Sequence, residues 1–145
     1  MPGKSDTFEN DLLKLIFNGT TIANLAINAT SSPLTNLYVA LHTGVGPEES
    51  EAQTTSEISY TGYARAAVAR TSVAWVVTGN SVSPALAIDF PEMTGGTGGT
   101  ATHVSVGTAA SGAGKILYSG ALTPSISVTT GVIPRIKTTS TITES

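Results

Sequence analysis

The chain has 145 residues, of which 40% are apolar and 12% are charged, and its formal net charge is −3. The charged share is about half of the usual ~25%, so the surface of the folded protein is weakly charged, which favours self-association or docking. The seven basic residues are scattered along the chain, which argues against direct binding of nucleic acid. The chain has no cysteine, which excludes disulfides and zinc–thiolate sites, and no apolar run approaches the roughly 18 residues of a membrane span.

The first predicted element is an amphipathic helix near the start of the chain. Its apolar residues at the helical period are Phe8, Leu12, Leu15 and Ile16. Asp6 is the expected N-cap, and Glu9 stands three residues later, as in a capping box. Gly19 follows the last apolar residue and is expected to end the helix.

Leu13 and Phe17 make the apolar stripe of this helix wider than that of a free surface helix. The helix is therefore expected to pack on a sheet of its own chain or on a neighbouring subunit. We predict that partner contacts fall on the widened face, which consists of Phe8, Leu12, Leu13 and Phe17.

From Leu37 onward the apolar period changes to two, which indicates β-strands. Leu37, Val39 and Leu41 face one side of the first strand, and the residues between them face the other. Further strands are expected at 57–60, 63–70, 75–78, 87–90, 102–106, 115–119, 126–128, 132–137 and 139–142. The prolines expected at strand ends or edges, because proline cannot donate to a ladder, are Pro84, Pro91, Pro124 and Pro134.

Many short strands separated by Gly, Pro and Asn predict an all-β fold. Because no helix alternates with the strands, a parallel α/β sheet is not expected. We expect an antiparallel, jelly-roll-like β-sandwich with one short N-terminal helix. In this single domain, an N-terminal arm and helix at residues 1–36 precede the sandwich at residues 37–145.

The glycine-rich loop at residues 107–115 resembles a phosphate-binding loop only in part. The positions that such a loop requires to be Gly and Ser or Thr hold Ala109 and Ile116. The residues that follow have the pattern of a strand, whereas a phosphate site of this kind uses the N-terminus of a helix. The loop is therefore predicted to connect two strands of a hairpin.

The remaining candidates for chemistry are two histidines and two groups of carboxylates: His42, His103, Glu48, Glu49, Glu51, Asp89 and Glu92. The histidines lack the spacing of a metal motif, although one histidine per chain could cluster where copies meet on an axis. The three loop glutamates lack calcium-loop spacing and are expected to be solvated. The last two carboxylates could do acid–base work, but no aromatic sugar-binding platform accompanies them. We therefore expect no catalytic residue, no metal and no cofactor.

Several sequence blocks, taken in order, resemble a known family. They are LYVALHT at 37–43, SEISYTGYAR at 56–65, GGTGGTATHV at 95–104, ILYSGALTP at 116–124 and GVIPRI at 131–136. This order resembles small virion structural proteins of tailed bacteriophages, which are named tail-fibre, minor structural or head decoration proteins. The resemblance covers Phe8 to about Thr141 and implies a compact β-sandwich that assembles on the virion, with no catalytic residues to carry over.

Two roles on the virion fit this resemblance. The preferred role is a capsid decoration (cement) or head-fibre-base protein, which binds the major capsid protein as a homotrimer suited to a local three-fold axis. The alternative is a tail-fibre, tail-tip or baseplate protein whose exposed loops, at 44–53 or 107–114, bind a host receptor. An enzyme that acts on a host polysaccharide is the third class, and neither nucleic acid nor a membrane is an expected partner. Assembly is expected in the host cytoplasm.

Overall fold

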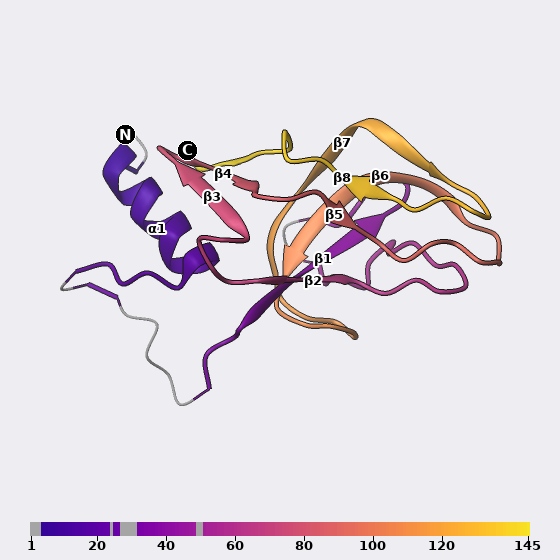
Figure 1. Ribbon diagram of the computed structural model, residues 1–145, viewed down its shortest axis with the longest axis horizontal. Helices are drawn as coiled ribbons and strands as arrows, with labels where there is room; N and C mark the ends of the chain where they lie inside the picture. Colours follow the sequence, from indigo (N-terminus) through magenta and orange to yellow (C-terminus); the bar gives the residue numbers. More distant parts are fainter. Residues whose placement is uncertain (1–3, 24, 27–31, 49–50) are drawn as a thin grey trace. The chain divides into compact units, whose positions relative to one another are not determined.

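The computed structural model describes residues 4–23, 25–26, 32–48 and 51–145 (Figure 1). The described chain is all-β apart from one short N-terminal helix, and its main sheets are antiparallel, as predicted. The elements are α1 Asp6–Asn18, β1 Asn36–His42, β2 Ala66–Ala69, β3 Trp75–Thr78, β4 Ser81–Pro84, β5 Ile88–Asp89, β6 Gly99–Gly107, β7 Ile116–Val128, β8 Arg135–Ile136 and β9 Ile142–Thr143.

The chain forms two compact units that are interleaved in sequence. Unit 1 comprises Met1–Asn36, Ala69–Ile88 and Ile136–Ser145, and unit 2 comprises Leu37–Val68 and Asp89–Arg135. The residues expected to form an N-terminal arm and helix therefore share a unit with two later segments of the chain.

The helix α1 of unit 1 begins one residue earlier than the sequence suggested. Ser5 has an extended backbone, with φ −76° and ψ 150°, and its hydroxyl accepts a hydrogen bond from the Phe8 N–H. Ser5, not Asp6, is thus the N-cap, and Glu9 stands one position beyond that of a capping box. Gly19 ends the helix in the left-handed conformation, φ 65°, as predicted.

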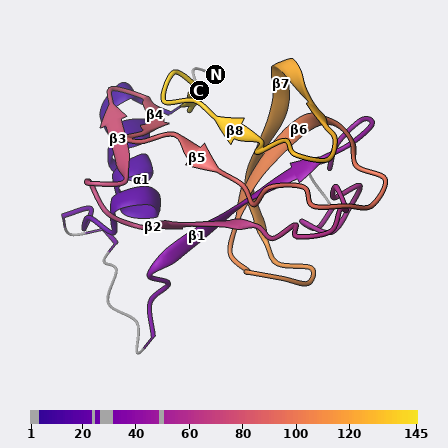
Figure 2. The same ribbon diagram turned by 45° about the vertical axis from the view of Figure 1, so that its right-hand side comes forward.

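The helix packs on a sheet of its own chain, which is the first of the two partners that the sequence left open. Figure 1 and Figure 2 both show α1 alongside β3 and β4, which form a three-stranded sheet with β9. The Phe17 ring meets the Trp75 ring edge-on at 4.9 Å. The Asn10 amide donates to the carbonyl of Gly79, in the turn between β3 and β4, at 2.6 Å. These contacts join the helix to the sheet along its length.

Arg70 closes the C-terminal end of α1, where the last carbonyls of a helix lack partners within the helix. Its guanidinium donates to the Leu15 carbonyl at 2.9 Å and to the Ile16 carbonyl at 2.7 Å. A third hydrogen bond, of 2.7 Å, reaches the Leu34 carbonyl. One side chain thereby ties the helix end to the segment that leads into β1.

Unit 2 is built on the four-stranded sheet of order β2-β1-β6-β7. β1 and β6 pair antiparallel, with Tyr38 opposite Gly107 and His42 opposite His103. β6 and β7 form a long hairpin (Figure 2). The loop between them leads into a strand, whereas a phosphate-binding loop leads into a helix. The prediction of a hairpin at residues 107–115 is confirmed.

Some strand boundaries differ from the predicted ones. β7 is one strand of 13 residues where the sequence suggested two, at 115–119 and 126–128. Its register shifts at residues 122–125, which lie opposite Thr102 alone. Residues 57–60 are irregular apart from an isolated bridge, and β4 was not predicted. The prolines nevertheless lie at strand ends, outside strands or on the edge strand: Pro84, Pro91, Pro124 and Pro134.

Candidate functional site

The two loops that the sequence singled out for binding lie together in unit 2. The backbone N–H of Gln53, at the end of the first loop, donates to the carbonyl of Ala113 in the second loop at 2.8 Å. Residues 49 and 50 of the first loop lie outside the described residues. In the second loop, Ala110 to Ala113 are exposed. The two loops therefore form one surface, which we call the loop platform and define as residues 44–48, 51–53 and 107–115.

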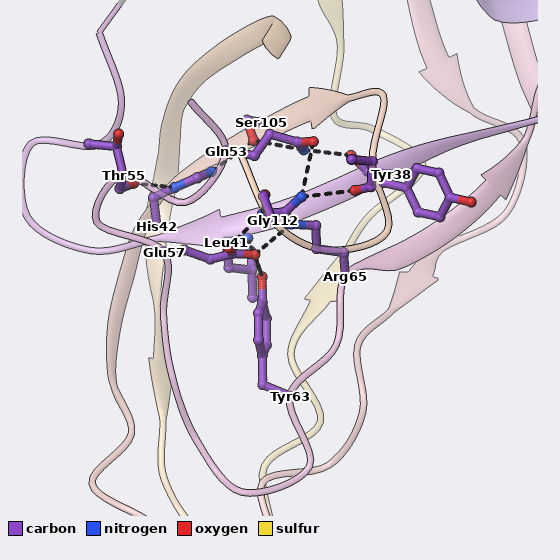
Figure 3. A network of polar contacts seen from close by, with 11 residues as sticks. Tyr38, Leu41, His42, Gln53, Thr55, Glu57, Tyr63, Arg65, Ser105 and Gly112 are labelled. Atoms are coloured by element: carbon purple, nitrogen blue, oxygen red, sulfur yellow. Dashed lines mark hydrogen bonds and ion pairs between the residues drawn. The ribbon is translucent and has the colours of Figure 1, made fainter. Parts of the chain in front are cut away.

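The buried side chain of Arg65 forms hydrogen bonds to the backbone of the loop platform (Figure 3). Arg65 forms a two-pronged ion pair with Glu57, in which Nε and Nη2 each lie 2.8 Å from a carboxylate oxygen. Its remaining N–H groups donate to the carbonyls of Ala109, at 2.8 Å, and Gly112, at 2.7 Å. Hydrogen bonding to Glu57 raises the pKa of Arg65. The side chain is 2% exposed, so this charge is neutralised inside the protein and fixes the hairpin loop.

Gln53 links the same loop to β1. Its amide nitrogen donates to the Tyr38 carbonyl at 3.0 Å, and its amide oxygen accepts from Arg65 Nη1 at 3.3 Å. A Cβ at Gly107 would lie 2.2 Å from this amide, so only glycine permits the approach. The fully buried Gln53 is therefore a polar element of the core, and its amide determines where the loop platform begins.

Glu57 also anchors the phenol of Tyr63. The Tyr63 hydroxyl donates to Glu57 Oε1 at 2.9 Å and accepts from the Leu41 N–H at 3.2 Å. Burial raises the pKa of Tyr63, so the phenol stays protonated over the whole physiological range. The Glu57 carboxylate thus receives hydrogen bonds from Arg65 and from Tyr63, which satisfies a charge close to the core.

His42 and Ser105 form a pair that superficially has the geometry of a base and a nucleophile. His42 Nε2 lies 2.8 Å from Ser105 Oγ. Nδ1 lies 2.9 Å from the Thr55 carbonyl, which can only accept, so Nδ1 carries the proton and Nε2 accepts from Ser105. Burial lowers the pKa of His42, which keeps the ring neutral. Both side chains have no exposed surface, so a substrate cannot reach them, and the pair instead joins β1 to β6.

The other predicted candidates for chemistry are dispersed. His103 bonds to Thr102 Oγ1 at 3.0 Å and packs against Gly46 in the loop platform. In the exposed acidic segment, the Glu48 N–H donates to a carboxylate oxygen of Glu51, and Glu49 lies outside the described residues. Within the described part of the chain, no three His, Cys, Asp or Glu residues come close enough to hold a metal.

Asp89 was weighed with Glu92 as an acid–base pair. Its carboxylate is instead engaged by Arg135, whose Nε and Nη2 donate to its two oxygens. This hydrogen bonding lowers the pKa of Asp89, which therefore stays ionised and is a poor general acid. The residue belongs to an exposed ion pair, and Glu92 is exposed beside it in sequence.

The predicted contact residues on α1 divide into two pairs. Leu13 and Phe17 are fully buried within the chain, because they pack under the sheet of unit 1, and they offer no surface to a partner. Phe8 is 37% exposed and Leu12 is half-buried, so a partner contact through these two stays a prediction.

Sequence reasoning missed a more exposed apolar pair in unit 1. Val73 and Leu86 are 83% and 77% exposed. The Ala85 N–H donates to the Ala74 carbonyl, which extends the β3–β4 ladder by one pair beyond the strands. Val73 and Leu86 are the next residues, so both lie at the end of this hairpin opposite its turn. The available signal was weak: an isolated valine and leucine in short, alanine-rich turns. We call Val73 and Leu86 the apolar tip.

The sequence matches a known protein family over nearly its whole length. The family described as "Podophage GP4 fiber I protein gp80" matches residues 3–144. The chain belongs to the Gp80 family. No curated protein matches the sequence. Membership in Gp80 makes the chain a structural protein of the bacteriophage virion, which confirms the resemblance to small virion proteins of tailed phages.

The family match covers nearly the entire described chain, so both units belong to the Gp80 pattern. Among the described residues, no helix is long and apolar enough to cross a membrane. The two units of this Gp80 chain are a helix-backed sheet with an apolar tip and a second sheet whose loops are fixed by a buried ion pair.

Proposed function

We propose that this Gp80 protein is a capsid decoration (cement) or head-fibre-base protein that binds the major capsid protein through unit 1. The observation that carries this proposal is the distribution of exposed apolar side chains. Six of the eight large ones among the described residues belong to unit 1: Phe8, Leu25, Leu34, Val73, Val76 and Leu86. Exposed apolar side chains that lie together mark protein–protein contact, and Val73 and Leu86 lie opposite each other at one end of the β3–β4 hairpin.

The low charge of the chain supports binding to a protein shell. Only 12% of the residues are charged, so docking would desolvate few charged side chains and would carry a small energetic cost. Self-association into a symmetric oligomer belongs to the same proposal, and the trimer suits a local three-fold axis of the shell. The role requires no catalysis, and neither nucleic acid nor a membrane is a partner in it. Assembly in the host cytoplasm is part of the proposal.

A tail-fibre, tail-tip or baseplate role is the second candidate, and the loop platform favours it. Arg65 fixes the hairpin loop through two carbonyls, while Ala110 to Ala113 stay exposed. A loop that is rigid before binding loses little conformational entropy on contact, which suits recognition of a receptor. The word "fiber" in the family's description is compatible with both candidates, because a fibre can stand on the head or on the tail.

Copy number on purified virions separates these candidates. Quantitative mass spectrometry against the major capsid protein should give on the order of hundreds of copies for a decoration protein and on the order of ten for a tail component, since each role follows the symmetry of its site. A head-fibre-base protein at a few vertices would also give a low number, so cryo-electron microscopy of particles with a labelled chain must show the head. Label at the tail tip would overturn the proposal.

A pair of matched variants tests the docking surface. Val73→Ser with Leu86→Ser removes the apolar tip of unit 1, and Val45→Ser with Ile133→Ser removes two exposed apolar residues of unit 2. Both variants should fold, because exposed side chains contribute little to stability. Added to particles that lack the protein, the first variant should bind at least about tenfold more weakly and the second should bind normally. Equal binding by both would contradict docking through the apolar tip.

A further inference from the structure

Glu9, in the helix of unit 1, is a buried acidic residue whose carboxylate has no partner within the described residues. The residue is 4% exposed, although a glutamate is almost never buried unless it is paired. Among the described residues, no hydrogen bond or ion pair reaches its carboxylate. The side-chain atoms that are wholly buried without a partner in this part of the chain are Asn18 Oδ1 and Trp75 Nε1. The Glu9 oxygens therefore keep a narrow contact with solvent, through which another protein can reach them.

The helix itself supplies no cation to Glu9. The positions three and four residues away, which face Glu9 on a helix, hold Ser5, Asp6, Leu12 and Leu13. Asp6 adds a like charge. Because Ser5 is the N-cap, Glu9 also stands one position too far along to bond back to it as in a capping box. The positive end of the helix dipole compensates the negative charge only in part.

The rest of unit 1 supplies no cation either. The strands on which α1 packs, β3 and β4, and their neighbour β9 contain no charged residue. Lys4 pairs with Glu144 at 3.1 Å, and Arg70 donates to the carbonyls at the end of α1. None of the ion pairs within the described residues joins Glu9 to the basic residues of this unit: Lys4, Lys14, Arg70 and Lys137.

Glu9 lies at the boundary between the buried and the exposed apolar residues of α1. At about 100° per residue, Phe8 and Leu12 lie on one side of it. Leu13 and Phe17 lie on the other side and are fully buried under the sheet. Phe8 is 37% exposed and Leu12 is half-buried. A protein that covers Phe8 and Leu12 therefore also passes over the Glu9 carboxylate.

We propose that the protein on which unit 1 docks covers Phe8 and Leu12 and presents an arginine side chain that forms an ion pair with Glu9. A guanidinium is weakly hydrated and bonds a carboxylate through two parallel hydrogen bonds, which suits a site with little contact with solvent. A partner without a cation would bury the charge completely and leave it unpaired, so Glu9 also selects against such partners. This inference rests on the proposed docking through unit 1 and adds the charge of the group that docks.

Glu9→Gln tests the ion pair, and Asp11→Asn is its matched control. Asp11 is an exposed carboxylate of the same helix, about 160° around the axis from Glu9. Added to virions that lack the protein, Glu9→Gln should bind at least about tenfold more weakly than the native chain, because the partner's guanidinium would be buried without its counter-charge. Asp11→Asn should bind normally. Native binding by Glu9→Gln, or an equal loss in both variants, would overturn the proposal.

The stability of the free chain separates a binding role of Glu9 from a structural one. Glu9→Gln removes an unpaired buried charge, so its melting temperature should equal or exceed that of the native chain. A clearly lower melting temperature would show that the carboxylate stabilises the fold and would overturn the proposal. Glu9→Met removes the charge and enlarges the apolar surface. A partner with an arginine should bind Glu9→Met more weakly than the native chain, and tighter binding would overturn the proposal in favour of an apolar partner.

The same virions distinguish failure of this inference from failure of the proposed function. The place of the bound native chain, on the head or on the tail, tests the proposed function, whereas the ratio of binding between Glu9→Gln and the native chain tests the ion pair. Tail binding that Glu9→Gln weakens about tenfold would contradict the capsid role and support the ion pair. Head binding that Glu9→Gln leaves unchanged would do the opposite. A native chain that does not bind these virions would overturn both.

Discussion

Unit 1 and unit 2 are each stabilised internally by a different kind of interaction. In unit 1 a helix buries Leu13 and Phe17 against a three-stranded sheet, and Trp75 completes the contact. In unit 2 the loops are fixed by directional bonds, above all those of Arg65. The buried polar side-chain atoms left without a partner among the described residues, Asn18 Oδ1 and Trp75 Nε1, both lie in unit 1. A buried polar atom without a partner lowers stability, so unit 1 depends on its apolar packing to offset this cost, whereas the network of unit 2 bonds its polar groups directly.

The largest effect is expected from Arg65→Met. The substitution keeps an unbranched side chain but leaves the Glu57 carboxylate without its cation and two loop carbonyls without donors. Breaking a buried pair in this way should lower the free energy of unfolding by about 3–5 kcal/mol, measured by urea denaturation. Arg135→Met breaks the exposed pair with Asp89, whose side chains are 58% and 44% exposed, and should lower the free energy of unfolding far less, because solvent screens this pair. Similar losses in both variants would show that unit 2 does not depend on its network.

The next effect concerns the packing of unit 1. Leu13→Ala creates a cavity under the helix, where the leucine has no exposed surface, and should lower the free energy of unfolding by about 2–5 kcal/mol. Leu12→Ala removes the same atoms from a half-buried position one residue away and should cost clearly less. If Leu12→Ala proved as costly as Leu13→Ala, the outer face of α1 would also be part of the core, and a partner contact through Leu12 would be excluded.

The difference between the units also explains what the sequence could predict. The helix followed from its apolar period and Gly19, because both signals lie within a few residues of each other. The all-β class and the hairpin at 107–115 followed from alternation and glycine for the same reason. The single strand β7 was divided in prediction because Gly120 and Pro124 have the composition of a turn.

The polar network could not be predicted because its partners are far apart in sequence. Arg65 bonds to carbonyls 44 and 47 residues later, and any residue type provides a carbonyl. Ser105 and His42 are 63 residues apart. Strand β4 was missed for a different reason: Ser-Val-Ser-Pro has little strand propensity, and pairing with β3 on one side and β9 on the other determines its conformation. Local patterns therefore gave the elements, and long-range contacts determined the candidate site.

A smaller effect is expected where the network meets the hairpin. Gly107→Ala places a Cβ within 2.2 Å of the Gln53 amide, which hydrogen bonds hold in position from two sides. Such overpacking should cost about 1–3 kcal/mol in thermal or urea unfolding. Gly120→Ala, on β7, meets nothing within 4 Å and should leave stability nearly unchanged. If the two variants were equally stable, Gln53 would have room to move, and the loop platform would be less rigid than its bonds imply.

The smallest effect is the pH dependence that His42 gives to unit 2. Burial holds its pKa in the folded protein below the ordinary value of 6.5, so between these two values the unfolded chain binds more protons than the folded chain. The contribution of the neutral ring is complete above about pH 6.5 and is lost as the pH falls through this window, by at most about 1.4 kcal/mol per pH unit. The free energy of unfolding of the native protein should therefore decrease from pH 7 to pH 5 more steeply than that of His42→Asn.

His103 provides the control for this last comparison, because it lies opposite His42 on β6 but is partly exposed. His103→Asn should keep most of the steep decrease of the native protein, since burial is the largest cause of the lowered His42 pKa and the nearby His103 is the smallest. Equal slopes for the native protein and His42→Asn would mean that His42 accepts a proton in the folded state without cost. Ser105 would then have to turn its hydroxyl away and accept from the charged ring, and this part of the network would tolerate rearrangement.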